Sequence, residues 1–238
     1  AQSTPKTTPQ TKSATTATPA PPAATTAKPA QTVKTDAAMS IQQRKYKREI
    51  VLTIGGKQNL WAISRFGGEG ETRLTNDTIQ LDFGDPLTGV YLDTDAWETQ
   101  KLPTLPTEDF EIQLDARRTG GFDFFCALTF PVGQGRATLV CGGWAGVVTG
   151  ISSIDGDDAS SNATKTLGSY KENQWYNIRL RVTPQRILAW VDNKKVVDHP
   201  RGKHKFDIRA EMELSTPIGV AAFQSDAEIK NVRLRVNR

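Results

Sequence analysis

Short apolar or alternating segments, separated by Gly, Pro, Asn and Asp, fill the sequence from Glu49 to the C-terminus. The segment Trp175–Val182 alternates most clearly, with apolar side chains at every second position from Tyr176 and polar ones between them. No segment keeps the 3.6-residue period of an amphipathic helix over a useful length. The pattern therefore predicts an all-β fold of two antiparallel sheets.

Thirteen segments qualify as short strands, which suits a two-sheet sandwich. The pair Asp192-Asn193 separates two of them and predicts a two-residue hairpin turn, because both residues tolerate positive φ. The predicted strands are Ile50–Ile54, Thr78–Phe83, Gly89–Leu92, Phe110–Arg117, Phe122–Phe130, Arg136–Cys141, Val147–Ile154, Trp175–Val182, Arg186–Val191, Lys194–Val197, Ile208–Leu214, Gly219–Phe223 and Glu228–Val236.

Residues 1–48 differ in composition from the rest of the chain. Of the first 40 residues, 10 are Ala, 11 are Thr and 6 are Pro, and none is aromatic. Such a segment cannot bury enough apolar surface to offset the entropy lost on ordering. We therefore expect a disordered Ala/Thr/Pro-rich tail over residues 1–48, followed by one β-sandwich domain over residues 49–238.

The net charge of +4 is unevenly distributed along the chain. Residues 1–49 carry eight Lys or Arg and two Asp or Glu, so they hold +6 and residues 50–238 sum to −2. The domain thus has no surplus of positive charge to neutralise phosphates, which argues against a nucleic-acid partner. No run approaches the roughly 18 consecutive apolar residues of a membrane-spanning helix, so no spanning segment is expected.

The N-terminal region also bears on the compartment. The chain begins at Ala1 rather than Met, as an exported protein does once its signal peptide is removed, although an expression fragment would begin in the same way. We expect export to the periplasm, the cell surface or the medium. The basic run Arg44–Arg48 could contact an anionic cell-wall or envelope polymer, or it could be a solvated boundary.

Three segments in the second half of the chain carry a family resemblance. They read R-I-x-x-W-V-D-N-x-x-V-V-D over Arg186–Asp198, P-I-G-V-A-A-F over Pro217–Phe223 and I-K-N-V-R-L-R over Ile229–Arg235. These segments resemble the closing half of concanavalin-A-like lectin/glucanase jelly rolls. Over roughly residues 50–238 the chain looks like the 3-keto-disaccharide hydrolase-like domain family, common in exported bacterial proteins. The resemblance implies a jelly-roll sandwich, whereas the fold alone does not establish an activity.

Two predicted strands flank Pro131–Gly135 and suggest a tight hairpin. With its centre near residue 133, Cys126 faces Cys141 and Leu128 faces Leu139 on one apolar face. The two cysteines then form either a cross-strand disulfide or a pair of buried thiols.

The same register places Asp123 opposite Trp144 on the other face of the hairpin. A carboxylate accepts paired hydrogen bonds from vicinal hydroxyls, and an indole face covers the C–H face of a pyranose. The pair therefore predicts a carbohydrate site. In the alternative interpretation, Trp144 belongs to the core and Asp123 pairs with Arg117 or Arg118.

The acidic segment Ser152–Asn162 holds three carboxylates, Asp155, Asp157 and Asp158, beside several hydroxyl and amide oxygens. Hard oxygen ligands at this density suit Ca²⁺. The spacing does not match an EF-hand loop, so the segment is either an irregular calcium site or a plain Asp/Gly/Ser turn.

A retaining glycosidase of this fold is expected to carry an E-x-D-x-x-E run on one strand. The nearest strand, Phe110–Arg117, lacks this run, and its polar face with Gln113 and Arg117 is either solvated or a weak ligand-binding surface. His199 and His204 share one basic stretch that is predicted to be a solvated loop. Neither a zinc site nor a Ser–His–Asp system is therefore indicated.

Three functions remain open on this basis. The first is an exported module that binds a glycan on the concave face of the jelly roll. The second, implied by the resemblance, is a hydrolase or lyase of 3-keto-glycosides, in which the ketone acidifies the neighbouring C–H so that one general base and an electrophile such as Ca²⁺ or Arg suffice. The third is a structural sandwich that recruits another protein. We place the glycan-binding module first because the sequence identifies no general base.

Overall fold

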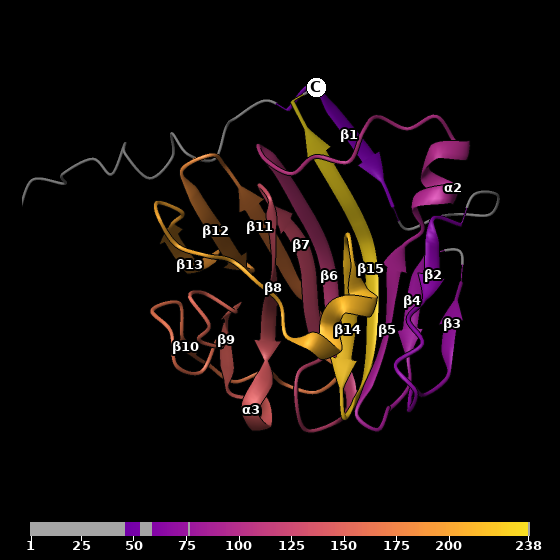
Figure 1. Ribbon diagram of the computed structural model, residues 1–238. Helices are drawn as coiled ribbons and strands as arrows, with labels where there is room; N and C mark the ends of the chain where they lie inside the picture. Colours follow the sequence, from indigo (N-terminus) through magenta and orange to yellow (C-terminus); the bar gives the residue numbers. More distant parts are fainter. Residues whose placement is uncertain (1–45, 53–58, 76, 238) are drawn as a thin grey trace, which may run out of the picture. The chain divides into compact units, whose positions relative to one another are not determined.

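Two antiparallel sheets face each other in the computed structural model (Figure 1). It describes residues 46–52, 59–75 and 77–237, which all belong to the unit Lys45–Arg238. Most of the predicted tail lies outside the described residues. The two-sheet architecture confirms the prediction of an all-β sandwich.

The larger sheet has eight strands in the order β13-β12-β11-β6-β15-β4-β3, with β1 paired to β15 off this path. Its strands are β1 (Arg48–Val51), β3 (Thr72–Leu74), β4 (Thr78–Leu81), β6 (Phe110–Gly121), β11 (Tyr176–Val182), β12 (Arg186–Val191), β13 (Lys194–Pro200) and β15 (Ser225–Val236).

The smaller sheet has seven strands in the order β10-β9-β8-β7-β14-β5-β2. Its strands are β2 (Trp61–Ile63), β5 (Leu87–Leu92), β7 (Cys126–Val132), β8 (Gly135–Gly142), β9 (Val148–Ser152), β10 (Thr166–Leu167) and β14 (Gly219–Phe223). Three short helical segments complete the described chain, namely α2 (Thr94–Thr99), α3 (Gly143–Gly146) and the 3₁₀ helix η1 (Ala210–Ser215).

The main core fills the space between the sheets. Alternate residues of β11, including Ile178 and Leu180, are fully buried and belong to the same apolar cluster as Leu128 and Leu139 of the smaller sheet. The predicted inward face of β11 is thus confirmed. Between β12 and β13, Val191 pairs with Lys194, so the hairpin turn also lies where the sequence predicts it.

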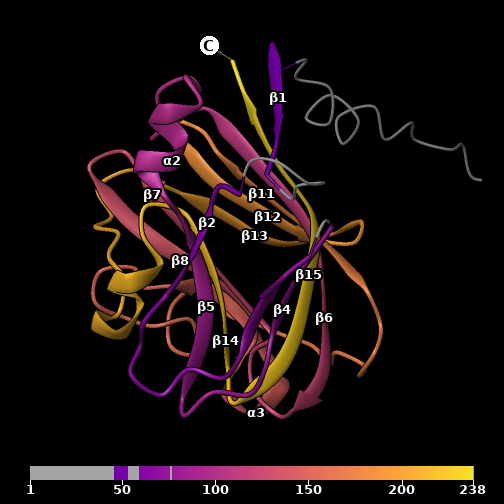
Figure 2. The same cartoon turned by 90° about the vertical axis from the view of Figure 1, so that its right-hand side faces the viewer.

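A second, smaller apolar cluster covers the other face of the smaller sheet. Ala127 of β7 and Ala221 of β14 belong to it, whereas their neighbours in the strands face the main core. Ile208 and Met212 cover these alanines from the segment that forms η1. Figure 2 shows η1, the golden turn on the left, outside the smaller sheet.

The predicted strand Ile208–Leu214 is wrong, because this segment forms η1. Met212 lies in the smaller apolar cluster, as an inward-facing strand residue would. Glu211 and Glu213, on either side of it, lie in the first turn of the 3₁₀ helix, where acidic side chains are favoured. The sequence also missed the three short strands β2, β3 and β10, which are two or three residues long.

Candidate functional site

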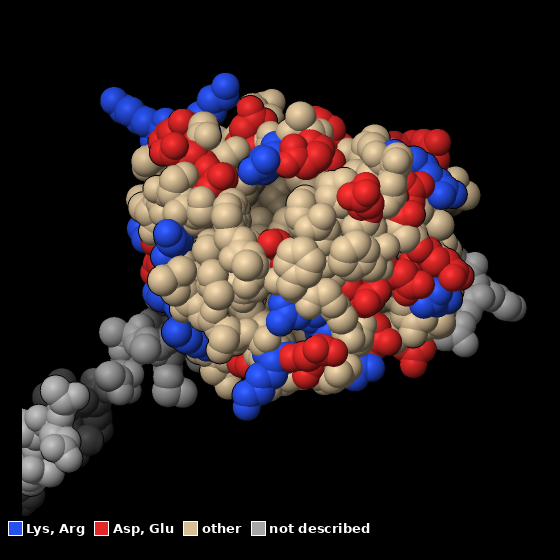
Figure 3. Space-filling view, turned by 90° about the horizontal axis from the view of Figure 1, so that it is seen from below, with Lys and Arg blue, Asp and Glu red and all other residues tan. Residues whose placement is uncertain are grey.

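A pocket lies on the outer face of the smaller sheet, where the segment leading into η1 crosses β7 and β8. Its volume is about 230 Å³, below the ~300–1,000 Å³ of pockets that enclose drug-sized ligands. Figure 3, which views the molecule from below relative to Figure 1, shows a hollow with acidic and basic side chains around it. The lining residues are Leu87, Asp123, Phe124, Ala127, Thr138, Val140, Trp144, Ser152, Arg209, Glu211, Met212 and Phe223.

The walls of this pocket are largely apolar and aromatic. The rings of Phe124 and Phe223 lie 5.4 Å apart and pack against Leu87 and Met212. Trp144 remains 36% exposed, although it lines the same pocket. A cavity of this kind, with a few polar groups at its edge, suits a small ligand that has both C–H and hydroxyl faces.

The turn over α3 holds Trp144 in place. Trp144 and Ala145 both adopt the left-handed conformation, with φ of 51° and 60°. This conformation costs about 1–3 kcal/mol per residue without glycine. Asp123 offsets part of this cost, because its Oδ2 accepts a 2.8 Å hydrogen bond from the backbone N–H of Ala145 and its Oδ1 accepts one from Phe124.

The predicted hairpin register is confirmed over the length of the β7–β8 ladder. Cys126 pairs with Cys141 and Leu128 with Leu139. The ladder ends there, and the left-handed turn that follows Gly142 replaces the predicted strand pairing of Asp123 with Trp144. Both residues nevertheless line one pocket, with the carboxylate occupied by backbone amides rather than left free.

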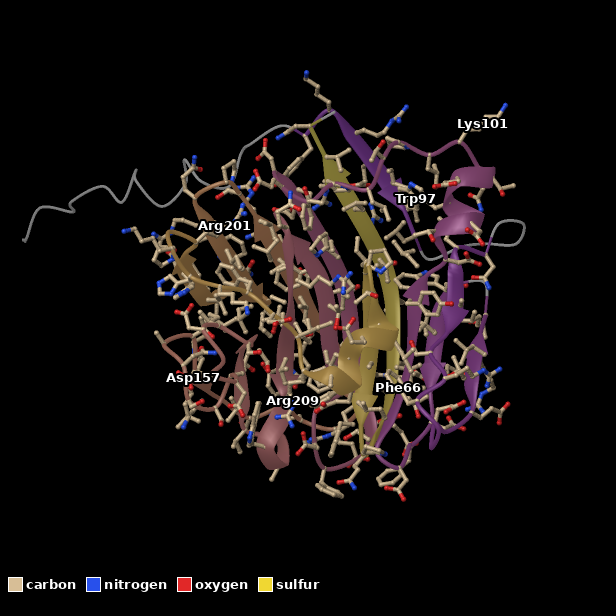
Figure 4. All side chains as sticks on the ribbon, viewed as in Figure 1. Phe66, Trp97, Lys101, Asp157, Arg201 and Arg209 are labelled. Carbon is tan, nitrogen blue, oxygen red and sulfur yellow. The ribbon has the colours of Figure 1, made fainter. Side chains whose placement is uncertain are left out.

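Two charged residues that the sequence analysis missed, Arg209 and Glu211, line the exposed side of the pocket. The Arg209 Nε donates to Glu211 Oε1 at 2.5 Å, and its guanidinium lies 3.8 Å from the carboxylate of Asp158. Figure 4 labels Arg209 between η1 and α3. The two glutamates of Ala-Glu-Met-Glu are typical of a first helical turn, and from the sequence they could have predicted η1.

Hydroxyl groups form part of the pocket floor. Thr138 and Ser152 are partners across β8 and β9, and both line the pocket. The Thr138 hydroxyl lies 3.0 Å from that of Thr129. The buried Ser152 Oγ has no hydrogen-bond partner among the described residues, so all of its hydrogen-bonding capacity is unused.

The structure does not bring Gln113 and Arg117 to this pocket. Both face outward from β6 in the larger sheet, where Arg117 forms a 2.6 Å ion pair with Glu228. The Arg117 guanidinium also stacks over the ring of Trp175 at 4.7 Å. Gln113 accepts a hydrogen bond of 2.7 Å from Arg235. These contacts make the polar face of β6 an interlocked surface network, separate from Asp123 and Trp144.

The acidic segment of residues 152–162 is held by contacts within it and by contacts to residues 204–207. The Oδ2 of Asp155 lies 2.6 Å from His204 Nδ1, and this hydrogen bond is the main reason why the pKa of Asp155 is lowered. Asp158 accepts a 2.8 Å bond from the Ser160 amide. Asp157, which Figure 4 labels, is exposed.

No three His, Cys, Asp or Glu side chains in the described part of the chain are grouped as they would be around a metal ion. Calcium binding by Asp155, Asp157 and Asp158 remains a prediction from the sequence.

His199 corrects the prediction of a solvated histidine loop. It belongs to β13 and is 8% exposed, because the alternation of that strand turns it inward with Val197. Its ring stacks 4.6 Å from that of His204. Burial is the main reason why the pKa of His199 is lowered.

The cysteines are free, buried thiols in the structure, one of the two predicted alternatives. The hydrogen bond to the Cys141 thiol, together with burial, raises the pKa of Cys126 well above its usual value. The phenol of Tyr170 packs nearby, and burial raises its pKa too. This end of the core is therefore uncharged at neutral pH.

Comparisons with solved structures find several chains of similar fold. Similar solved structures include the carbohydrate-binding module CBM66 from Bacillus subtilis (12% identity, 74% of this chain, 96% of that chain, TM-score 0.45). Others are a carbohydrate esterase from the Shiga toxin-encoding bacteriophage phi24B (11%, 82%, 99%, 0.49) and the apo Crh5 transglycosylase (8%, 80%, 84%, 0.50). At 8% identity, the likeness to the transglycosylase shows the fold alone.

A comparison with curated proteins finds no match. Among the described residues, no helix has the length and apolar character needed to cross a membrane. The model of the 3-keto-alpha-glucoside-1,2-lyase-like domain matches residues 78–235, which is more than half of the chain. With this match and the jelly-roll sandwich described above, the chain belongs to the 3-keto-alpha-glucoside-1,2-lyase-like domain family.

Proposed function

We propose that this protein binds a carbohydrate in the pocket on the outer face of the smaller sheet. The observation that carries the proposal is the exposed indole of Trp144, which is held beside polar side chains in an otherwise apolar cavity. Aromatic faces cover the C–H face of a sugar ring, while charged and hydroxyl groups at the edge hydrogen-bond to its hydroxyls.

Each side of a bound sugar ring has a partner in this arrangement. Trp144 and Phe124 offer aromatic surface. Arg209, which is exposed, and Ser152, which is buried, offer hydrogen-bonding groups along the lining of the pocket. Asp123 acts as a positioning residue, since both of its oxygens hold the backbone next to the indole.

The experiment is a glycan array that includes mono- and disaccharides, followed by calorimetric titration of the sugars that bind. Trp144→Ala should lower the affinity about tenfold or more, as expected for a central aromatic contact. Trp175→Ala is the matched control, because Trp175 lies under Arg117 and Lys230 on the larger sheet. An array without any bound sugar, or equal affinity in the Trp144 variant, would contradict the proposal.

A second candidate function is elimination on a 3-keto-glycoside, which the family match and the Arg209–Glu211 pair favour. In such a substrate the C3 carbonyl acidifies the C2–H bond. The Glu211 carboxylate would take the C2 proton while the Arg209 guanidinium stabilises the enolate oxygen. The C1–O bond then breaks as the C1=C2 bond forms. The leaving sugar oxygen takes the proton from Glu211, which yields an unsaturated 3-keto sugar and a free sugar.

Incubation with a 3-keto-disaccharide tests this second function through the absorbance of the enone product. Glu211→Gln should lower turnover about a hundredfold or more, which is the usual size of a general-base contribution. Glu213→Gln is the control, because Glu213 lies on the same 3₁₀ helix but pairs with Arg136. No turnover by the unmodified protein would leave binding as the function.

We also propose that the protein acts outside the cytoplasm, as the resemblance to a domain family common in exported bacterial proteins implies. The basic run Arg44–Arg48 would then face anionic envelope polymers. Fractionation of cells that express the full-length gene product tests this location.

A further inference from the structure

We propose that the pocket continues into an aromatic platform on which an uncharged glycan chain lies, so that the ligand is a polysaccharide or long oligosaccharide. The inference rests on the proposed function, which places one sugar unit in the pocket. The platform consists of five exposed apolar side chains, Phe83, Phe122, Trp144, Val147 and Leu167.

These five side chains are between 36% and 65% exposed. Single exposed apolar residues are common on protein surfaces, whereas a contiguous group marks a binding surface. The five come from four separate segments of the chain, namely the β4–β5 connection, the β6–β7 connection, the α3 turn and β10.

Backbone contacts place one half of the platform together. Leu167 pairs with Val148, and the carbonyl of Val147 accepts a 3.0 Å hydrogen bond from Gly168, so β10 runs beside the end of the α3 turn. A Cβ atom added at Gly146 would lie 3.3 Å from the carbonyl oxygen of Phe122. The β6–β7 connection therefore runs directly beside the α3 turn.

The other half gathers around the β14–β15 connection. The Phe122 amide donates to the carbonyl of Gln224 at 3.3 Å. The Phe83 amide donates to Asp226 Oδ1 at 2.7 Å. Phe122 thus lies beside the β14–β15 connection and Phe83 beside the start of β15, so the segments that carry the platform adjoin one another.

Trp144 joins the platform to the pocket, because it lines the cavity and is also exposed at the surface. Figure 3 shows a broad area without charged side chains at this end of the molecule, next to the hollow. Aromatic surfaces that continue beyond a one-sugar pocket match the repeated C–H faces of successive sugar units.

Charge argues for an uncharged occupant. The segments next to Phe83 carry five carboxylates and two guanidinium groups, from Glu69, Glu71, Asp82, Asp85, Asp226, Arg65 and Arg73. Figure 3 shows acidic side chains gathered at one side of this face. At the Phe83 end, such a surface repels anionic lipid headgroups and acidic polymers, whereas a neutral glycan has no charge to oppose it.

Native gel electrophoresis in gels that contain soluble starch, mixed-linkage β-glucan, arabinoxylan or galactomannan tests the platform. The unmodified protein should be retarded by at least one of these polymers. Phe122→Ala and Phe83→Ala should each weaken that retardation about fivefold or more, while the affinity for a disaccharide in the pocket stays unchanged. Val51→Ala is the control, because Val51 is equally exposed on β1 away from the platform.

Three results would overturn the platform. The first is equal retardation of the phenylalanine variants and the unmodified protein. The second is disaccharide binding that depends on Trp144 without retardation by any polymer, which leaves the proposed function intact. The third is co-sedimentation with vesicles of phosphatidylcholine and phosphatidylglycerol that is lost in Phe122→Ala, since a membrane would then be the occupant.

Discussion

Asp123 accepts a hydrogen bond of 2.8 Å from the backbone N–H of Ala145, and this contact joins the β6–β7 connection to the turn that carries Trp144. The second oxygen of the carboxylate accepts from Phe124, so one side chain holds backbone on both sides. The backbone of Asp123 is itself anchored, because its amide and its carbonyl both bond to the Ser225 hydroxyl at 3.0 Å. The position of the indole therefore depends on a residue that is not itself free to bind a ligand.

Asp123→Ala should weaken both folding and sugar binding. The loss of two backbone hydrogen bonds should lower the free energy of unfolding by about 1–3 kcal/mol. The affinity for sugar should fall as well, because the left-handed turn at Trp144 is no longer held. Urea denaturation and calorimetric titration measure the two effects.

Glu172→Ala is the control for this variant, since Glu172 is exposed and has no hydrogen-bond or ion-pair partner among the described residues. Unchanged sugar affinity in Asp123→Ala, despite lower stability, would separate the turn from the binding site. That result would contradict the positioning role of Asp123.

The sequence predicts strands well where alternation and a tight turn act together. The register of β7 and β8 follows from the apolar face of the hairpin and the position of its turn, so Cys126 and Cys141 are found opposite each other. The pocket was only partly predictable, because one wall comes from residues 208–215, far along the chain. In that segment, Met212 fits a strand pattern and a helical turn equally well, and only tertiary packing decides between them.

The two thiols should be unreactive in the folded protein. The hydrogen bond to the Cys141 thiol, followed by burial, raises the pKa of Cys126, so little Cys126 thiolate is present near neutral pH. We expect no reaction of native protein with a thiol-specific chromogenic disulfide at pH 8, and two reactive thiols per chain after unfolding in guanidinium chloride. If unfolded protein purified without reductant shows no thiol, the predicted disulfide is the correct alternative.

Stability should fall in acid partly through Glu69. The backbone amides of Glu69 itself and of Gly67, in that order, lower the pKa of this carboxyl to about 2. The usual Glu value is about 4.3. The folded state thus favours the ionised form, and this contribution is present above about pH 4.3 and is lost as the pH falls toward 2.

In Glu69→Gln, the free energy of unfolding should decrease less steeply across this acid range than in the unmodified protein. Glu172→Gln serves again as the control and should keep the original slope. Chemical denaturation at several pH values gives both slopes, and parallel curves for Glu69→Gln and the unmodified protein would show that the Glu69 hydrogen bonds do not form in solution.

The acidic segment of residues 152–162 yields a metal test. If Asp155, Asp157 and Asp158 bind Ca²⁺, then CaCl₂ should raise the thermal midpoint after treatment with EDTA, because an ion bound only by the folded state stabilises it. MgCl₂ should do so much less, since Mg²⁺ loses its water reluctantly. Asp157→Asn should weaken the response. An unchanged thermal midpoint in CaCl₂ would show that the segment is a plain Asp/Gly/Ser turn.

Ser152→Ala should separate binding from stability. The Ser152 hydroxyl is buried in the pocket floor without a hydrogen-bond partner among the described residues, so its removal costs no internal bond. The free energy of unfolding should stay the same or rise, because an unpaired buried polar group is unfavourable. If the hydroxyl bonds to the sugar, the affinity should fall about five- to tenfold, which corresponds to about 1–1.4 kcal/mol.

Ser215→Ala is the matched control, because the Ser215 hydroxyl is also buried and unpartnered among the described residues but is absent from the pocket lining. It should show the same response in stability and no change in affinity. Equal sugar affinity in the Ser152 and Ser215 variants would show that the Ser152 hydroxyl does not contact the sugar. The aromatic wall would then have to provide the binding with the charged edge alone.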